Sequence, residues 1–218
     1  MSDIAKDSMP DSSEKDATEE EYEDLGNYVD ASSSEEEEDS EEEEMSNEEA
    51  AEMYKAEGNE FYKKKDYFAA IKQYDEAIKL MPEECKYYGN RAAASLMLGL
   101  YERVVTDCQT ALKLDKDFLK CHLRLAKAQL SLGRFDEAEA SLTQLYLRDP
   151  RSTDVPNERS KIKLSKARLE KAQKNLKEGK YAHALSYLHS AQEHCAASKE
   201  LKQMKAEALV MSGKFDEA

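Results

Sequence analysis

Small residues recur in this sequence at a spacing of 34 residues, and this repetition limits the folds that are open to the chain. Two series have the spacing: Gly58, Ala92 and Ala126, and, twelve residues later, Ala70, Val104 and Ala138. Small side chains are needed where two helix backbones approach closely, because the distance between packed helices depends on the residues at the contact. A repeat of this length therefore predicts helix pairs that stack, each burying its apolar face only against its neighbours.

Large residues fill fixed positions between the small ones. The first repeat contains Tyr54, Phe61 and Tyr74 and ends at Pro82, and the third repeat ends at Pro150. The segments KKKDYFAAIKQYDEAI and LGRFDEAEASL each indicate a turn followed by a second helix. This pattern resembles the tetratricopeptide repeat. The resemblance implies an all-α fold, a right-handed solenoid of antiparallel helix pairs. From the composition we expect a disordered acidic tail before it.

The repeats are expected to begin abruptly after the tail. Ser46 followed three residues later by Glu49 is a capping-box pattern, in which each side chain bonds to the backbone amide of the other residue. Residues 46–152 are predicted to hold three repeats, and these would form the binding part of the array. The three units are expected at residues 51–84, 85–118 and 119–152.

The spacing is interrupted after the third unit. Ala172 and Ala184 are twelve residues apart, which predicts a fourth repeat shifted by twelve residues from the earlier phase. We interpret residues 153–164 as a linker that elongates the helix leading into it. Residues 165–218 would then contain the fourth repeat and a fifth that includes Ala206. Because the sequence stops inside the start of a second helix, we expect the fifth repeat to be truncated.

The charge of the chain is divided unevenly. The formal net charge is −15, yet residues 1–50 contain 22 acidic residues against two lysines, so the remainder is mildly basic. Residues 1–45 include SSSEEEEDSEEEE and few aliphatic residues, a composition that favours a disordered tail. A solubilising role is one interpretation, and competition for a basic surface of the same molecule is the other.

The composition also bears on the compartment. No apolar run approaches the roughly 18–20 residues of a membrane-spanning helix, and the first residues show neither a secretory signal nor a mitochondrial presequence. The four cysteines show no close pairing and are interpreted as buried thiols in a reducing compartment: Cys85, Cys108, Cys121 and Cys195. We predict the cytoplasm, with the nucleus left open as a second location.

Five polar residues fall on one face of the first helices of the three repeats. Lys55 and Asn59 are four residues apart in the first repeat, Asn90 lies in the second, and Lys120 and Arg124 are four apart in the third. Ammonium, guanidinium and amide groups share the ability to donate hydrogen bonds to a carboxylate. A solvated helix face is the alternative interpretation for each residue taken alone.

The motifs around these residues resemble the tetratricopeptide domains that carry a dicarboxylate clamp. They are KAEGNEFY, YYGNRAA and KCHLR, and all five clamp positions match. The resemblance implies binding of the C-terminal EEVD tails of the seventy- and ninety-kilodalton heat-shock chaperones. Lys55, Asn59 and Asn90 would hold the terminal α-carboxylate, and Lys120 and Arg124 would hold the side chain of the last aspartate.

A wider likeness covers roughly residues 50–218. The segments YYGNRAA, LMLG, DKDFLKCHLR, LSLG and KAEALVMSGKFDEA are similar to the co-chaperone family of DnaJ homolog subfamily C member 7. That family carries many tetratricopeptide units and a C-terminal J-domain. The HPD motif of a J-domain does not occur in this sequence. Stimulation of chaperone ATP hydrolysis is therefore not predicted for this chain.

Other functions have little support in the sequence. No phosphate-binding loop, GxSxG, HExxH or Cys–His constellation occurs, so we predict no enzyme activity and no cofactor. His183, His189 and His194 lie near Cys195, but their spacings do not favour a metal site. Neither nucleic acid nor a membrane is an expected partner. The predicted function is a non-catalytic co-chaperone adaptor, and the alternative is a general repeat scaffold for a non-chaperone partner.

Overall fold

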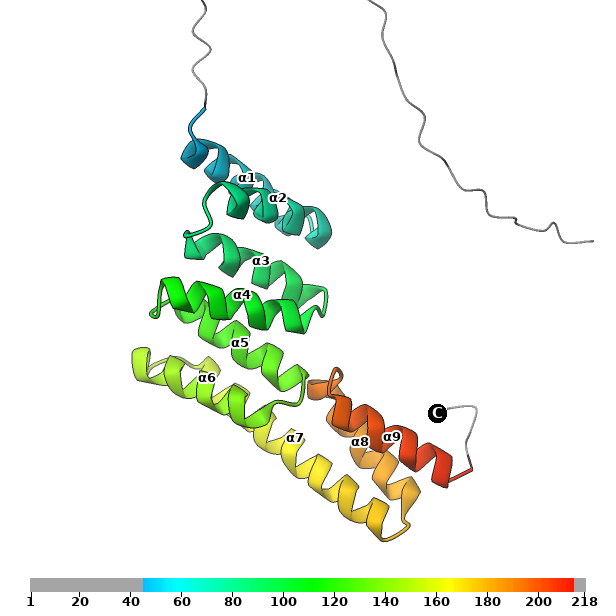
Figure 1. Ribbon diagram of the computed structural model, residues 1–218. Helices are drawn as coiled ribbons and strands as arrows, with labels where there is room; N and C mark the ends of the chain where they lie inside the picture. The colour runs from blue at the N-terminus through cyan, green and yellow to red at the C-terminus, as the bar shows by residue number, and fades with distance from the viewer. Residues whose placement is uncertain (1–44, 214–218) are drawn as a thin grey trace, which may run out of the picture. The chain divides into compact units, whose positions relative to one another are not determined.

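The computed structural model describes residues 45–213, which form nine helices and no strand (Figure 1). The all-α prediction is confirmed. The acidic tail predicted over residues 1–45 lies outside the described residues, apart from Met45. The helices are α1 (Asn47–Lys63), α2 (Tyr67–Leu80), α3 (Cys85–Met97), α4 (Tyr101–Leu114), α5 (Leu119–Ser131), α6 (Phe135–Arg148), α7 (Asp154–Lys177), α8 (Tyr181–Cys195) and α9 (Lys199–Met211).

The helices pair in the order of the chain. The most extensive contacts join α1 to α2, α3 to α4, α5 to α6 and α7 to α8. The first helices of successive pairs also contact one another, α1 with α3, α3 with α5, α5 with α7 and α7 with α9. One sequence repeat therefore corresponds to one helix pair, and equivalent positions of the first helices lie side by side.

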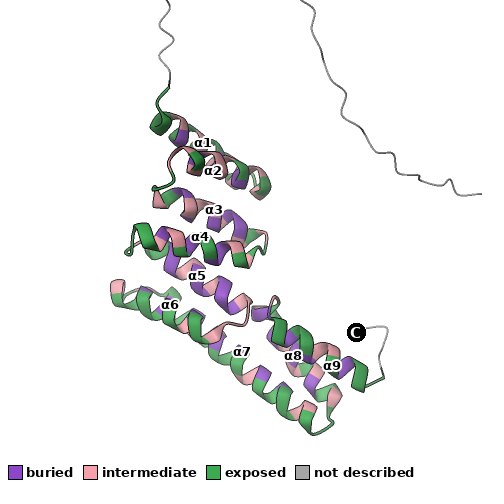
Figure 2. Ribbon diagram, in the orientation of Figure 1, coloured by how far each residue is buried: buried purple, intermediate pink, exposed green. Residues whose placement is uncertain are grey.

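The apolar core is a row of clusters between helices rather than one central mass. Figure 2 shows the buried residues recurring along every helix. The small residues of the 34-residue series are among them, since Ala70, Ala92 and Ala138 are completely buried. Gly58 is buried as well, and a Cβ atom at this position would lie 2.6 Å from the ring of Tyr74. The small residues thus set how closely the helices approach.

The predicted capping box is present at the start of α1. The Ser46 Oγ accepts a hydrogen bond from the Glu49 amide at 3.2 Å, and the Ser46 amide donates to the Glu49 carboxylate at 3.0 Å. These bonds to Ser46 lower the pKa of the Glu49 carboxyl, because they favour its charged form. Helix α1 therefore begins directly after Ser46, as the capping-box pattern indicates.

Helix α7 is 24 residues long and packs against two different partners. Its first turns place Val155 and Ile162 in the cluster that contains Leu142 of α6. Its later turns place Leu169 in the cluster that contains Leu188 of α8. The twelve-residue shift in the repeat pattern coincides with the added turns that cover the third helix pair. No helix among residues 45–213 combines the length and apolar character needed to span a bilayer.

One residue with a left-handed backbone follows the first helix of each repeat. Gly99, Gly133, Gly179 and Gly213 occupy this position with φ between 71° and 78°. The equivalent residue of the first repeat is Lys65, with φ 63°. A side-chain-bearing residue is disfavoured there, because its Cβ approaches the following carbonyl oxygen.

Replacing Lys65 with glycine should raise the free energy of unfolding by about 0.5–1 kcal/mol. Relief of the left-handed strain, about 1–2 kcal/mol, exceeds the added entropy of glycine in the unfolded chain. Urea denaturation measures the change. The matched control is Lys64→Gly. Lys64 has φ −73°, so glycine relieves no strain there, and this variant should be less stable than the parent chain. A lower stability of the Lys65→Gly variant would contradict the role assigned to this turn.

Candidate peptide-binding face

The five predicted binding residues come from three neighbouring helices. Lys55 and Asn59 lie on α1, Asn90 on α3, and Lys120 and Arg124 on α5. These are the first helices of three successive pairs, which contact one another in that order. We call this set of five residues the clamp face.

Asn59 and Asn90 are in direct contact across α1 and α3. The Asn90 Nδ2 donates a hydrogen bond to the Asn59 Oδ1 at 3.4 Å. The same oxygen accepts a stronger bond from the hydroxyl of Tyr74 on α2, at 2.8 Å. Burial raises the pKa of Tyr74 to about 12, so this hydroxyl keeps its proton and donates at neutral pH. The Asn59 Nδ2 has no partner within residues 45–213, and it is the group left to donate to a ligand.

Arg124 is held beside this pair. Its Nη1 donates to the backbone carbonyl oxygen of Gly89 at 2.9 Å, which places the guanidinium next to Asn90. One bond to a backbone oxygen leaves several of the five guanidinium N–H groups free. The structure therefore brings Asn59, Asn90 and Arg124 together as a cluster of donors without a carboxylate of its own.

The two lysines of the clamp face form no hydrogen bond with this cluster within residues 45–213. Lys55 forms an ion pair with Glu52 one turn earlier on α1, and the Glu52 carboxylate also accepts a bond from the Tyr87 hydroxyl at 2.9 Å. The hydrogen bond from Lys55 is the main cause that lowers the pKa of Glu52. Lys120 is exposed. Within residues 45–213, no hydrogen bond or ion pair joins either lysine to the other three residues.

An ion network around Arg91, the residue after Asn90, holds α3 in place. The Arg91 guanidinium donates twice to Asp107 of α4, at 3.0 and 2.6 Å, and once to Asp75 of α2, at 2.6 Å. Asp107 is only 2 % exposed, so breaking this pair would leave a buried charge unpaired. The network holds α3 between α2 and α4, with Asn90 directed toward α1. Arg91 therefore stabilises the packing of α3, although it directly follows Asn90 of the clamp face in the sequence.

The sequence did not reveal three polar groups near the clamp face. In the sequence, Tyr74 falls at a packing position, and the repeat pattern indicates no polar contact for Glu52 or Tyr87. Tyr74 is 1 % exposed and Tyr87 is 2 % exposed, so hydrophobic periodicity alone identifies both as core residues. A hydroxyl in the core was the available signal, since a buried tyrosine usually bonds to a partner.

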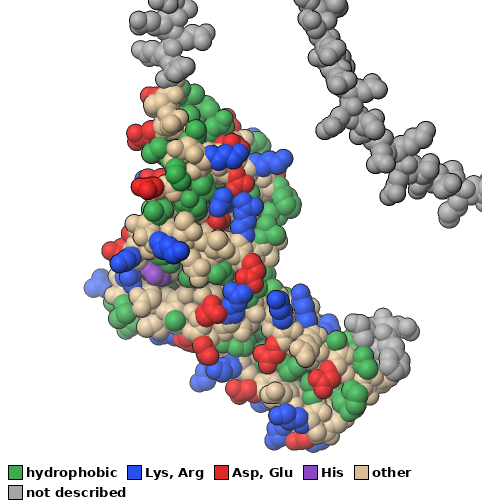
Figure 3. All heavy atoms as spheres, in the orientation of Figure 1, with side chains coloured by type: hydrophobic (Ala, Val, Ile, Leu, Met, Phe, Trp, Pro, Cys, Tyr) green, Lys and Arg blue, Asp and Glu red, His purple; other side chains and the backbone are tan. Residues whose placement is uncertain are grey.

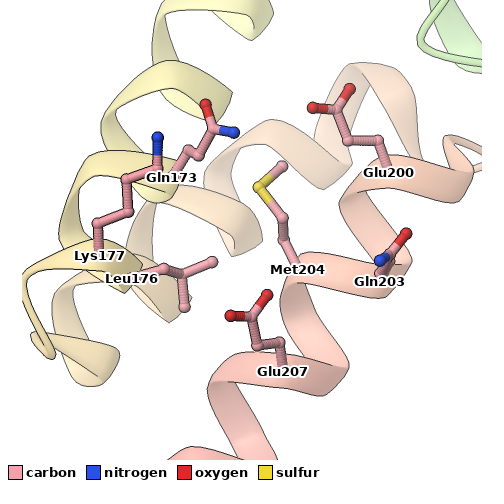
Figure 4. Close-up of a pocket in the computed structure, with 7 residues that line it drawn as sticks. All are labelled: Gln173, Leu176, Lys177, Glu200, Gln203, Met204 and Glu207. Carbon is pink, nitrogen blue, oxygen red and sulfur yellow. The ribbon is translucent and has the colours of Figure 1, made fainter.

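A cavity of about 370 Å³ lies between α7 and α9, away from the clamp face (Figure 4). Figure 4 shows the carboxylates of Glu200 and Glu207 directed toward the space between the two helices. By repeat position, Gln203 and Glu207 correspond to Lys55 and Asn59. The donor set of the first repeats is thus not repeated here. The cavity is lined by Gln173, Leu176, Lys177, Glu200, Gln203, Met204 and Glu207.

The surface charges of the array are mixed. Figure 3 shows basic and acidic side chains interspersed on the face that it presents. Many of them form exposed pairs, such as Lys63 with Glu60 and Lys79 with Glu76, which contribute little to stability. Among residues 45–213, no three histidine, cysteine or acidic side chains gather in a way that could hold a metal ion.

Comparison with known proteins agrees with the repeat architecture. Residues 95–162 match the family model described as tetratricopeptide repeat. The tetratricopeptide domain of Arabidopsis OM64 is 36 % identical, with a TM-score of 0.53, and the match covers 54 % of this chain and 97 % of that domain. The chain belongs to the tetratricopeptide-repeat family.

This tetratricopeptide protein is similar to two further relatives. Human DnaJ homolog subfamily C member 7 is 33 % identical over 168 residues, which are 77 % of this chain and 34 % of that protein. The chain thus spans about a third of that relative's length. The second tetratricopeptide domain of human RPAP3, solved in complex with the HSP70 peptide SGPTIEEVD, is 32 % identical with a TM-score of 0.51. That match covers 52 % of this chain and 95 % of the RPAP3 domain.

Proposed function

We propose that this tetratricopeptide protein is a non-catalytic co-chaperone adaptor whose clamp face binds EEVD tails of heat-shock chaperones of the seventy- and ninety-kilodalton classes. The cluster of Asn59, Asn90 and Arg124 carries the proposal. Three side chains with N–H donors come from three helices, no carboxylate bonds to them within residues 45–213, and their remaining N–H groups can donate to a ligand carboxylate. The RPAP3 domain supports it further, because that similar domain was solved with a peptide ending in EEVD.

Each end of the clamp face has its own task in this proposal. The Nδ2 groups of Asn59 and Asn90, with Lys55, would bind the terminal α-carboxylate. Arg124 and Lys120 would bind the side chain of the last aspartate, for which the planar guanidinium offers two parallel donors. Capture of a chain terminus in a preformed donor set gives specificity for the free carboxyl group. An internal EEVD segment, which lacks that group, would bind much less well.

A titration with the peptide SGPTIEEVD tests the proposal. The free acid should bind with a dissociation constant on the order of 1–10 μM, and the C-terminal amide should bind at least about tenfold more weakly. Arg124→Ala and Lys120→Glu should each weaken binding of the free acid about tenfold, because each removes a charge-assisted hydrogen bond. Isothermal titration calorimetry measures these constants.

Controls for this titration come from residues outside the clamp face. Arg134→Ala removes a guanidinium from the α5–α6 turn, where Arg134 bonds to Glu102 at 2.6 Å. Lys113→Glu reverses a charge on α4. Both variants should bind like the parent chain. Equal binding of the acid and the amide would rule out the clamp mechanism.

Glu52 offers a second test, because its carboxylate forms an ion pair with Lys55 and so competes with a ligand for that ammonium group. Glu52→Gln should tighten binding of the free-acid peptide about threefold, since it frees the ammonium and removes a like charge near the ligand. Glu76→Gln is the matched control: Glu76 forms the same kind of pair with Lys79, but on α2. Weaker binding of the Glu52→Gln variant would mean that Glu52 holds Lys55 in place instead of competing for it.

The cavity between α7 and α9 favours a second candidate function, a general scaffold for a non-chaperone partner. Its carboxylates repel a chain terminus, so a partner there would differ from the one proposed for the clamp face. Affinity capture with the Arg124→Ala variant separates the two functions. Retention of all major partners would favour the scaffold, and loss of the chaperones would favour the clamp.

A further inference from the structure

The first repeat differs from the others at the repeat position of Tyr74. Cys108, Leu142 and Leu188 occupy this position in the second, third and fourth repeats, and all four side chains are at most 1 % exposed. Packing of the helix pair therefore needs only an apolar side chain or a thiol here. The hydroxyl of Tyr74 is an addition that packing does not explain.

Two neighbours of Tyr74 differ in the same repeat. Gly58 stands where the other repeats have alanine, at Ala92, Ala126 and Ala172. A Cβ atom at Gly58 would lie 2.6 Å from the Tyr74 Cε1, so the glycine makes room for the larger ring. Asn59 stands where the other repeats have Ala93, Lys127 and Gln173. The three departures are linked through Tyr74, whose ring lies against Gly58 and whose hydroxyl bonds to the Asn59 Oδ1 at 2.8 Å.

From this contact we infer that Tyr74 is a positioning residue that fixes the orientation of the Asn59 amide, so that its Nδ2 faces the ligand. The inference rests on the proposed function of the clamp face. An asparagine amide can turn over and exchange its oxygen for its nitrogen. In the wrong orientation Asn59 would present its oxygen to the ligand carboxylate, and the two acceptors would repel each other.

Two donors keep the amide in the binding orientation. The Tyr74 hydroxyl and the Asn90 Nδ2 both bond to the Asn59 Oδ1, at 2.8 and 3.4 Å. A turned amide would lose the bond from Asn90, because two N–H groups would then face each other. It could donate to the Tyr74 oxygen, but the proton of this buried hydroxyl would then have no acceptor within residues 45–213. Burial fixes the ring of Tyr74, so the hydroxyl cannot move to another acceptor. The first repeat thus supplies a preorganised donor, which reduces the ordering cost of binding.

The variant Tyr74→Phe tests this role, because it keeps the ring and removes only the hydroxyl. We expect the free-acid peptide SGPTIEEVD to bind about fivefold to tenfold more weakly, and binding of its amide to change much less. In the Asn59→Ala background, Tyr74→Phe should cause no further loss, because Tyr74 acts through Asn59. Tyr88→Phe is the matched control, since its hydroxyl bonds to the backbone oxygen of Pro82 at 2.9 Å, and its affinity should stay unchanged.

A readout without ligand separates this inference from the proposed function. In NMR spectra of the free chain, the side-chain amide signals of Asn59 should differ in chemical shift from those of an exposed asparagine, because the Tyr74 hydroxyl bonds to the amide oxygen. In Tyr74→Phe these signals should move toward those of an exposed asparagine such as Asn157. Unchanged Asn59 signals, or an equal loss of affinity in the Asn59→Ala background, would overturn the positioning role. A parent chain that binds the acid and the amide equally would contradict the proposed function instead.

Discussion

The close approach of helices at small residues is the constraint on which the rest of the structure depends. Ala70, Ala92 and Ala138 leave almost no volume between paired helices, and larger side chains at these positions would push the pairs apart. Because each pair packs only on its neighbours, the same spacing sets the rotation and the height of every first helix. Residues 34 positions apart then lie side by side. The donors of three separate repeats share one face for this reason alone.

The residues of the clamp face lie at positions where the repeats of this chain differ from one another. The clamp face depends on residues that the other repeats do not share, and Gly58, Asn59 and Tyr74 change together in the first repeat. In the fifth repeat, Gln203 and Glu207 stand at the positions of Lys55 and Asn59, and they line a cavity of different charge. A solenoid can therefore present distinct surfaces along one regular scaffold. The shared repeat pattern explains the scaffold, and the differences between repeats give each surface its own side chains.

The sequence predicted the helices far better than the contacts at the clamp face. Helix pairs follow from local periodicity, and the capping box at Ser46 follows from two residues three positions apart. Two contacts depend on side-chain rotamers and on pairs of residues that are distant in the sequence. The Tyr74 hydroxyl bonds to Asn59, 15 residues away, and Arg124 bonds to the carbonyl of Gly89, 35 residues away. Periodicity reports burial and not the partner of a buried polar atom. The binding roles of the five clamp residues and the domain limits therefore remain predictions.

A crystal structure of the chain with a free-acid EEVD peptide would test the central claim most directly. We predict that the terminal α-carboxylate lies within about 3 Å of the Nδ2 atoms of Asn59 and Asn90, and that the guanidinium of Arg124 bonds to the side chain of the last aspartate. We further predict that the Asn59 amide keeps its bond from Tyr74. A peptide terminus bound between α7 and α9, with no peptide at the clamp face, would show that the clamp face is not the binding site.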